Sequence, residues 1–188
     1  MTKVQFGCGP NQLDGWTNLQ ENEGDITRPL NFADNSVDYI LVEHVVEHVT
    51  HKQAWRFFEE AYRILKKGGV LRVIVPSVDK IWRESDYYYR AFISSNAPQW
   101  FVSVGLPSPG QPMTDKACVE AIIFCHGHQS CWNMEMLYTF LEAIGFDARP
   151  SPYGESTFPE LNGVDQHWKL MGLDRCKLES VVVEGVKR

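Results

Sequence analysis

The chain opens on the stretch that decides its fold, Lys3-Val4-Gln5-Phe6-Gly7-Cys8-Gly9-Pro10. Its first half alternates polar and apolar residues, as a half-buried strand does, and it runs directly into Gly7-Cys8-Gly9. An α/β domain begins in this way when the turn after its first strand lies against a ligand. Glycine suits such a turn because backbone without a Cβ atom can pass close to a bound molecule. We therefore predict a strand followed by a ligand-binding loop.

No full helix is expected after this loop. Residues 10–16 are rich in turn formers and have no helical period, which is unusual for a dinucleotide-binding fold. The Gly-x-Gly pattern also lacks the third glycine that such a fold places in its first helix. We expect only a short second strand, at residues 17–20.

The clearest pattern in the chain is a strand, a helix and a second strand between residues 37 and 76. Residues 37–42 are a nearly continuous run of strand formers, typical of a buried parallel strand. Thr50 and Gln53 make a capping-box pair at a helix start, and we expect Gly68-Gly69 to end that helix. The helix has one apolar face, formed by Ala54, Phe57, Phe58, Ala61, Tyr62 and Leu65. A strand at residues 70–75, closed by Pro76, completes a βαβ unit.

The second half of the chain combines an irregular segment with one clear helix. Residues 77–125 have no clean period and are rich in aromatic residues, so we expect an irregular insertion that shapes a substrate pocket. Asn133 and Gly145 are expected to cap a helix. Short strands are expected at residues 146–149 and 180–186.

The composition fits one globular domain that spans residues 1–188. Of the 188 residues, 44% are hydrophobic and 22% are charged, which is ordinary for such a domain. The formal net charge of −6, without any Lys/Arg run, argues against a non-specific nucleic-acid binder, which needs a basic surface. The sequence has five scattered cysteines, no apolar run of bilayer length and no signal peptide after Met1. We therefore expect free thiols in a reducing, cytoplasmic setting.

Five motifs carry a resemblance to a known family. In chain order they are Gly7-Cys8-Gly9-Pro10, Gly15-Trp16-Thr17-Asn18, the stretch from Leu30 to Asp38, Glu43-His44-Val45-Val46-Glu47-His48, and the stretch from Arg63 to Gly69. In this order and spacing the sequence resembles class I S-adenosylmethionine-dependent methyltransferases, and more narrowly the compact bacterial and phage type with a shortened loop from Gly-Cys-Gly to Gly-Trp. The resemblance covers residues 4–76 and resumes at the helix from Asn133 and at the last strand. It implies a three-layer α/β, Rossmann-like methyltransferase fold with a mostly parallel central sheet and a truncated N-terminal half.

The resemblance also implies methyl transfer from S-adenosyl-L-methionine, which we expect to go to a small-molecule or glycan acceptor. This cofactor has no pyrophosphate, in agreement with the missing third glycine. DNA amino-methylation is disfavoured because Glu43-His44 stands where such enzymes carry Asn/Asp-Pro-Pro-Tyr. The residues expected to bind the cofactor are Phe6, Gly7, Cys8, Gly9, Pro10, Gln20, Glu21, Asp25, Ile26, Glu43 and His44.

One position departs from the family pattern. Relatives end the second strand with an acidic residue that accepts both ribose hydroxyls, and this chain has Gln20 there. Glu21 or Glu23 could serve instead, or the amide could bind the ribose more weakly, and an acid at position 20 is expected to tighten cofactor binding. Asp25 matches the acidic residue that approaches the adenine amino group in relatives.

Catalytic candidates lie at the end of the strand at residues 37–42. Glu43 and His44 follow this strand at the edge where open α/β sheets bind ligands, and they could contact the cofactor or exchange protons with the acceptor. His128 is the third candidate, because a loop with histidine precedes the corresponding helix in the resembling family. We expect Glu47 and His48 to be structural.

Two alternatives stay open. Gln20 also fits a catalytically degenerate protein that binds adenosylmethionine for regulation. His44-x-x-Glu47-His48 matches the motif of inverted zinc metallopeptidases, but such a motif lies within a helix, and this one begins at a strand end. A second cluster of possible metal ligands consists of Cys118, Cys125, His126, His128 and Cys131. Its residues do not have the paired spacing that is typical of zinc sites. We therefore predict no metal site.

Overall fold

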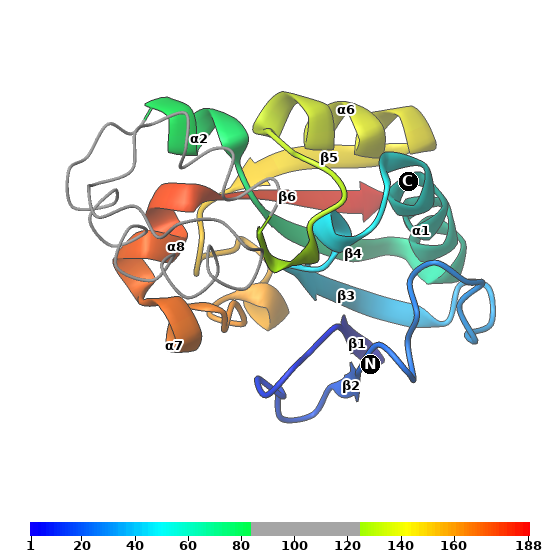
Figure 1. Cartoon of the computed structure of the whole chain (residues 1–188). Helices are drawn as coiled ribbons and strands as arrows, with labels where there is room; N and C mark the ends of the chain where they lie inside the picture. The colour runs from blue at the N-terminus through cyan, green and yellow to red at the C-terminus, as the bar shows by residue number, and fades with distance from the viewer. Residues whose placement is uncertain (84–124) are drawn as a thin grey trace.

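The computed structural model describes residues 1–83 and 125–188, and it has a six-stranded sheet at its centre (Figure 1). The strand order is β2-β1-β3-β4-β6-β5, and only β6 runs against the other strands. The strands are β1 Lys3–Phe6, β2 Thr17–Leu19, β3 Val37–Glu43, β4 Leu65–Pro76, β5 Phe146–Ser151 and β6 Ser180–Lys187. The predicted mostly parallel sheet is confirmed.

Helical segments pack on both faces of this sheet and make the three layers (Figure 1). On one face, α1 (His51–Ile64) and α6 (Met134–Ile144) contribute to the larger apolar core. On the other face, side chains such as Leu41 and Ile74 pack against the segment from Tyr153 to Val164 and against Cys176. The remaining helical segments are η1 Val46–His48, α2 Val78–Arg83, η2 Cys125–Gly127, η3 Pro159–Leu161, α7 Trp168–Met171 and α8 Leu173–Glu179.

The N-terminal half is truncated as expected. No helix separates β1 from β2, and β2 forms an edge of the sheet. The pairing is parallel, with Phe6 opposite both Leu19 and Val42. The residues that follow these three strands therefore emerge at the same edge of the sheet.

The βαβ unit is present, but its helix ends earlier than predicted. The Thr50 side chain and Gln53 form the expected capping box. The helix stops at Ile64 rather than at Gly68-Gly69, because Leu65 has extended backbone and already pairs with Val37 in the sheet. The two glycines instead lie inside β4, where Gly68 has φ +77° and a Cβ atom on Gly69 would lie 2.9 Å from the Lys66 carbonyl oxygen.

The later elements follow the sequence pattern. Asn133 Oδ1 accepts a 2.8 Å hydrogen bond from Met136 N at the start of α6, and Gly145 ends that helix. The expected strands at 146–149 and 180–186 are β5 and β6. Of the insertion predicted at residues 77–125, the structure shows α2 and η2 at its two ends, and residues 84–124 lie outside the described residues. None of the helices in the described ranges is long and apolar enough to span a bilayer.

Candidate functional site

The glycine loop after β1 lies at the edge where three strands end. Gly7 and Gly9 have φ +64° and +51°, a region that favours glycine. A Cβ atom on Gly7 would lie 2.4 Å from Val45 Cγ2, whereas one on Gly9 would meet nothing within 4 Å. Gly7 is therefore required for packing against the segment after β3, and Gly9 borders open space that a ligand can enter.

Gln20 fixes the shape of this loop. Its side-chain Nε2 donates a 2.7 Å hydrogen bond to the Gly9 carbonyl oxygen, and Cys8 N donates to the Leu19 carbonyl oxygen at 3.2 Å. The Cys8 side chain is buried and Pro10 is exposed. The predicted ribose residue thus closes the loop from the end of the neighbouring strand.

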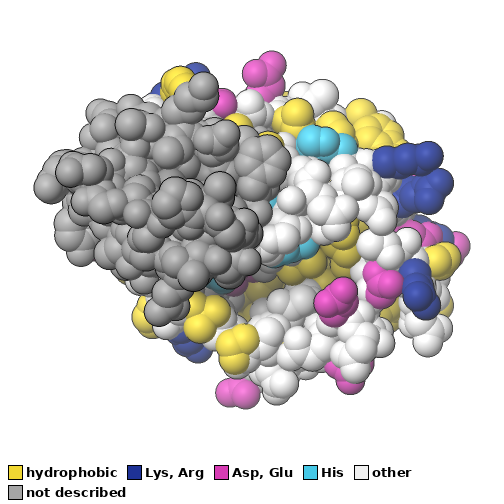
Figure 2. Space-filling view, viewed as in Figure 1, with side chains coloured by type: hydrophobic (Ala, Val, Ile, Leu, Met, Phe, Trp, Pro, Cys, Tyr) yellow, Lys and Arg dark blue, Asp and Glu magenta, His cyan; other side chains and the backbone are white. Residues whose placement is uncertain are grey.

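A cavity of about 470 Å³ lies beside the ends of β1 and β2, and a more open hollow with Gln20 in its wall adjoins it. Glu21 and Asp25 line both, and Phe6 lines the cavity. Figure 2 shows a furrow on this face with hydrophobic side chains in its floor and acidic side chains along its rim. A cavity of this size accommodates a cofactor or a small substrate.

Asp25 is held as an ionised acceptor in this wall. Its Oδ1 accepts hydrogen bonds from Thr27 N at 2.9 Å and Thr27 Oγ1 at 2.6 Å, and Arg28 Nε lies 3.0 Å from Oδ2. These hydrogen bonds from Thr27 lower the pKa of Asp25 below its usual range. The neighbouring Ile26 is buried. The carboxylate is therefore shared between the turn and any ligand that reaches it.

Glu43, at the end of β3, anchors the segment that covers the second face of the sheet. It accepts hydrogen bonds from Tyr153 Oη at 2.7 Å, Gln166 N at 2.8 Å and His167 N at 3.1 Å. Burial raises the pKa of Glu43 to about 7. The structure thus gives Glu43 a clear part in positioning its neighbours.

His44 lies next to Glu43 in a strained and enclosed position. Its φ is +52°, rare for a residue with a side chain, and such strain gathers at functional sites. The ring stacks on His167 at 4.0 Å, and Nε2 lies 3.2 Å from Ser180 Oγ. Burial lowers the pKa of His44 to about 4, so the ring is neutral at pH 7. His44 caps neither of the helical segments that follow it, because Val45 is the N-cap residue of η1 and Thr50 is that of α1.

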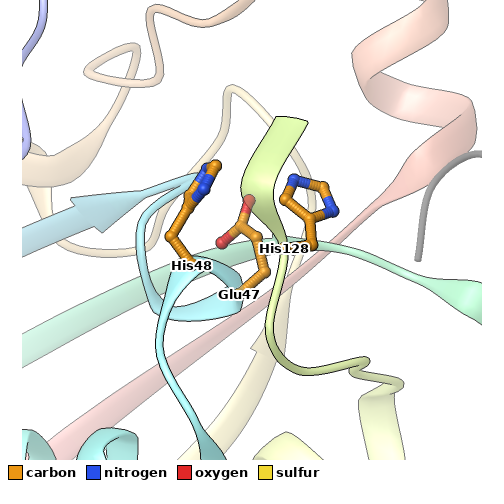
Figure 3. A group of neighbouring side chains, drawn as sticks. All are labelled: Glu47, His48 and His128. Carbon is orange, nitrogen blue, oxygen red and sulfur yellow. The ribbon is translucent and has the colours of Figure 1, made fainter. Parts of the chain in front are cut away.

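His128 lies with Glu47 and His48 rather than directly beside Glu43 (Figure 3). The His128 and His48 rings meet edge to face at 4.8 Å. His44 Nδ1 approaches the same group, 3.3 Å from Glu47 Oε1, though without hydrogen-bond geometry. Glu47, which we expected to be structural, thus lies near two of the three predicted catalytic residues, His44 and His128.

The inverted-peptidase geometry is not present. His44 precedes η1 with a left-handed backbone, so His44 and His48 do not lie one turn apart on a single helix face. The motif matches in sequence only.

Sequence reasoning missed a buried charge cluster that supports this edge from behind. The fully buried Arg72 side chain bonds Asp165 through Nε at 2.7 Å and Glu184 at 2.5 Å. Asp165 in turn accepts from Gly154 N at 2.6 Å, so the cluster holds the segment that Glu43 also binds. The available signal was a single arginine in the middle of the apolar run at residues 70–75. His167 lies in a segment without any period and had no such signal.

The comparisons with known proteins agree with this geometry. A family model described as a methyltransferase domain matches residues 5–73. The chain is similar to an S-adenosylmethionine-dependent methyltransferase from Archaeoglobus fulgidus, with 12% identity, a TM-score of 0.53 and coverage of 99% of this chain and 86% of that one. No curated protein sequence matches the chain significantly.

Two further solved structures share this fold. Phosphoethanolamine N-methyltransferase 2 of Haemonchus contortus, in complex with S-adenosyl-L-methionine, has 13% identity and a TM-score of 0.54, with coverage of 99% of this chain and 48% of that one. A Thermotoga maritima methyltransferase, described as a possible histamine N-methyltransferase, has 18% identity and a TM-score of 0.51, with coverage of 100% and 82%.

At these identities the solved structures establish the fold, which is that of class I methyltransferases. The domain match covers the glycine loop, the Glu43-His44 edge and most of the βαβ unit. The domain match and the shared fold support an S-adenosylmethionine-dependent methyltransferase, with S-adenosylmethionine as the cofactor.

Proposed function

We propose that the chain transfers the cofactor's methyl group to a small-molecule or glycan acceptor at the carboxyl edge of β1, β2 and β3. The observation that supports this proposal is the open space beside Gly9. This space lies at the edge of the sheet where β2 and β3 also end, next to Gln20 and Glu43-His44. The residues that we propose to bind the cofactor are the eleven predicted from the sequence, from Phe6 to His44.

Methyl transfer makes modest demands on such a site. When bound, the cofactor would supply an electrophilic methyl group, which a lone pair of the acceptor would take as the carbon–sulfur bond breaks, with S-adenosylhomocysteine as the leaving group. Alignment and exclusion of water supply most of the catalysis. A neutral His44 and a Glu43 held by three hydrogen bonds suit positioning better than proton transfer. Of the three catalytic candidates, the half-buried His128 lies in the loop before α6, and we expect the acceptor to bind near this loop.

Charge supports the class of acceptor, and the cavity of about 470 Å³ beside the ends of β1 and β2 is large enough for the cofactor. The net charge of −6 is unfavourable for a polyanionic acceptor such as nucleic acid. We place the activity in a reducing, cytoplasmic compartment, which the free thiols of Cys8, Cys131 and Cys176 support.

A methyl-release assay tests this proposal. The full chain is incubated with methyl-labelled cofactor and a panel of small amines, carboxylic acids, phenols, thiols and glycans. We expect labelled product from one acceptor class and an equal amount of S-adenosylhomocysteine. A chain that binds the cofactor but transfers label to nothing in a broad panel would favour the regulatory alternative suggested by Gln20.

A further inference from the structure

Glu47 is a buried carboxyl group whose nearest basic neighbour, His44 Nδ1, lies 3.3 Å away without hydrogen-bond geometry. Its side chain is 1% exposed, and neither carboxylate oxygen has a hydrogen-bond partner within the described residues. A buried carboxylate is costly unless it is paired or binds a metal ion. This group therefore needs an explanation that the fold alone does not supply.

Two imidazoles flank this carboxyl group. Figure 3 shows the Glu47 carboxylate between the rings of His48 and His128. One ligand atom from each of the three residues lies within 4.8 Å of the other two. Ligand atoms that share one transition-metal ion lie roughly 3–4 Å apart, since each bond is about 2.0–2.2 Å long. The three groups therefore have to approach one another slightly when they share an ion.

The two segments that carry these side chains are fastened to each other. Gln129 N and Ser130 N both donate to the Glu47 carbonyl oxygen, at 2.8 and 3.1 Å. Gln129 Nε2 donates to the His48 carbonyl oxygen at 2.7 Å, and Ser130 Oγ lies 3.3 Å from the Val46 carbonyl oxygen. The loop with His128 is therefore held against η1 by hydrogen bonds that do not use the three side chains. Such a framework keeps the three groups near one another before any ion binds.

We propose that Glu47, His48 and His128 form a binding site for a divalent transition-metal ion. Two imidazole nitrogens and one carboxylate oxygen suit zinc, iron, cobalt or manganese better than magnesium or calcium, which prefer oxygen ligands. Three protein ligands leave at least one coordination position open for water or a ligand. The ion supplies the positive charge that Glu47 lacks.

The site adjoins the cofactor loop. Val45, which directly precedes η1, packs against Gly7, so the segment that carries Glu47 and His48 starts beside the glycine loop. The His44-x-x-Glu47-His48 motif thus contributes two ligands through its last two residues, and His128 takes the place that a peptidase would give to the first histidine. The expectation of no metal site rested on sequence spacing, which does not bring residues 48 and 128 together.

Metal titration of the full chain tests the site. The protein is stripped with a chelator, and ZnCl₂, MnCl₂ and MgCl₂ are titrated separately by calorimetry without cofactor, so the result does not depend on the proposed methyl transfer. We expect about one zinc ion per chain, bound more tightly than magnesium. Absence of zinc and manganese binding at about 1 mM metal, or tighter binding of magnesium, overturns the proposal.

Matched variants show whether these residues hold the ion. We expect Glu47→Gln and His128→Ala each to weaken zinc binding by more than about 100-fold, since even an outer-shell partner is worth about 10–100-fold. His126→Asn is the control, because His126 lies in the same loop but outside the group, and asparagine tolerates its φ of +64°. We expect it to bind zinc as the wild type does.

Stability separates loss of a ligand from loss of the fold. Without metal, Glu47→Gln is expected to unfold at the same temperature as the wild type or higher, because a buried neutral amide costs less than a buried carboxylate. Removal of even an outer-shell partner weakens metal binding by about 10–100-fold. If Glu47→Gln weakens zinc binding by less than about 10-fold, the ion binds elsewhere and the assignment is wrong.

Discussion

The side-chain amide of Gln20 donates a hydrogen bond of 2.7 Å to the carbonyl oxygen of Gly9. This bond joins the end of β2 to the glycine loop after β1. It gives a donor role to the position where related enzymes carry an acid, and a carboxylate cannot fill that role because it only accepts.

We therefore expect Gln20→Glu to weaken binding of S-adenosylhomocysteine about 3- to 10-fold, since a hydrogen bond is worth about 0.5–1.5 kcal/mol. This reverses the expectation from the family pattern that an acid at position 20 tightens binding. Calorimetric titration measures the change, and Gln12→Glu on the exposed part of the same loop controls for added charge. Tighter binding by Gln20→Glu would show that position 20 contacts the ribose directly.

Gly9→Ala is expected to reduce cofactor affinity beyond its effect on stability. The added methyl group meets no protein atom within 4 Å, so it projects into the space proposed for the cofactor. Gly68→Ala is the matched control. Gly68 also has a left-handed backbone, with φ +77°, and a Cβ atom there would likewise meet nothing within 4 Å. It lies in the first part of β4, away from the carboxyl edge of the sheet. Both variants should lose about 1–2 kcal/mol of stability from the left-handed backbone. Equal cofactor affinities in the two variants would place the cofactor away from Gly9.

Arg72→Met is expected to destabilise the fold by about 3–5 kcal/mol, because it leaves two buried acids, Asp165 and Glu184, without their cation. Chemical denaturation measures the loss. Removal of the acids as well, in Arg72→Met with Asp165→Asn and Glu184→Gln, should recover much of the stability. A small effect of Arg72→Met alone would mean that the two acids are neutral in the folded chain.

The pair formed by Asp38 and Lys66 predicts a modest dependence of stability on pH. The Lys66 side chain lies 2.9 Å from Asp38 and holds the pKa of that carboxyl below its usual value of 3.8. The contribution is therefore full above that value and is lost as pH falls through the lower folded-state pKa. Asp38→Asn should cost less than about 1 kcal/mol at pH 7, because the pair is partly exposed. The difference from the wild type should vanish once the pH is below the folded-state pKa of Asp38, and a difference that persists in acid would assign it to packing.

Local patterns predicted the elements that depend on neighbours in sequence. The strand before Gly7, the capping box of Thr50 and Gln53, and the helix between Asn133 and Gly145 are all present. The end of α1 was predicted four residues late, because the pairing of Leu65 with Val37 determines it and no local glycine does.

The site itself depends on contacts between distant segments, which sequence spacing does not reveal. His167 stacks on His44, and His128 meets His48, which lies 80 positions earlier in the chain. Arg72 forms ion pairs with Asp165 and Glu184, which lie on two other segments. The sequence therefore identified the edge of the sheet and several of its residues, but not which side chains lie in contact.

Calorimetric titration of the wild-type chain with S-adenosylhomocysteine tests the central claim most directly. We predict one binding site with a dissociation constant between about 1 µM and 1 mM, the range in which enzymes commonly bind their substrates. The binding should weaken in Gly9→Ala but not in Gly68→Ala. Absence of heat at millimolar ligand, with the protein folded, would contradict the assignment of this edge as the cofactor site.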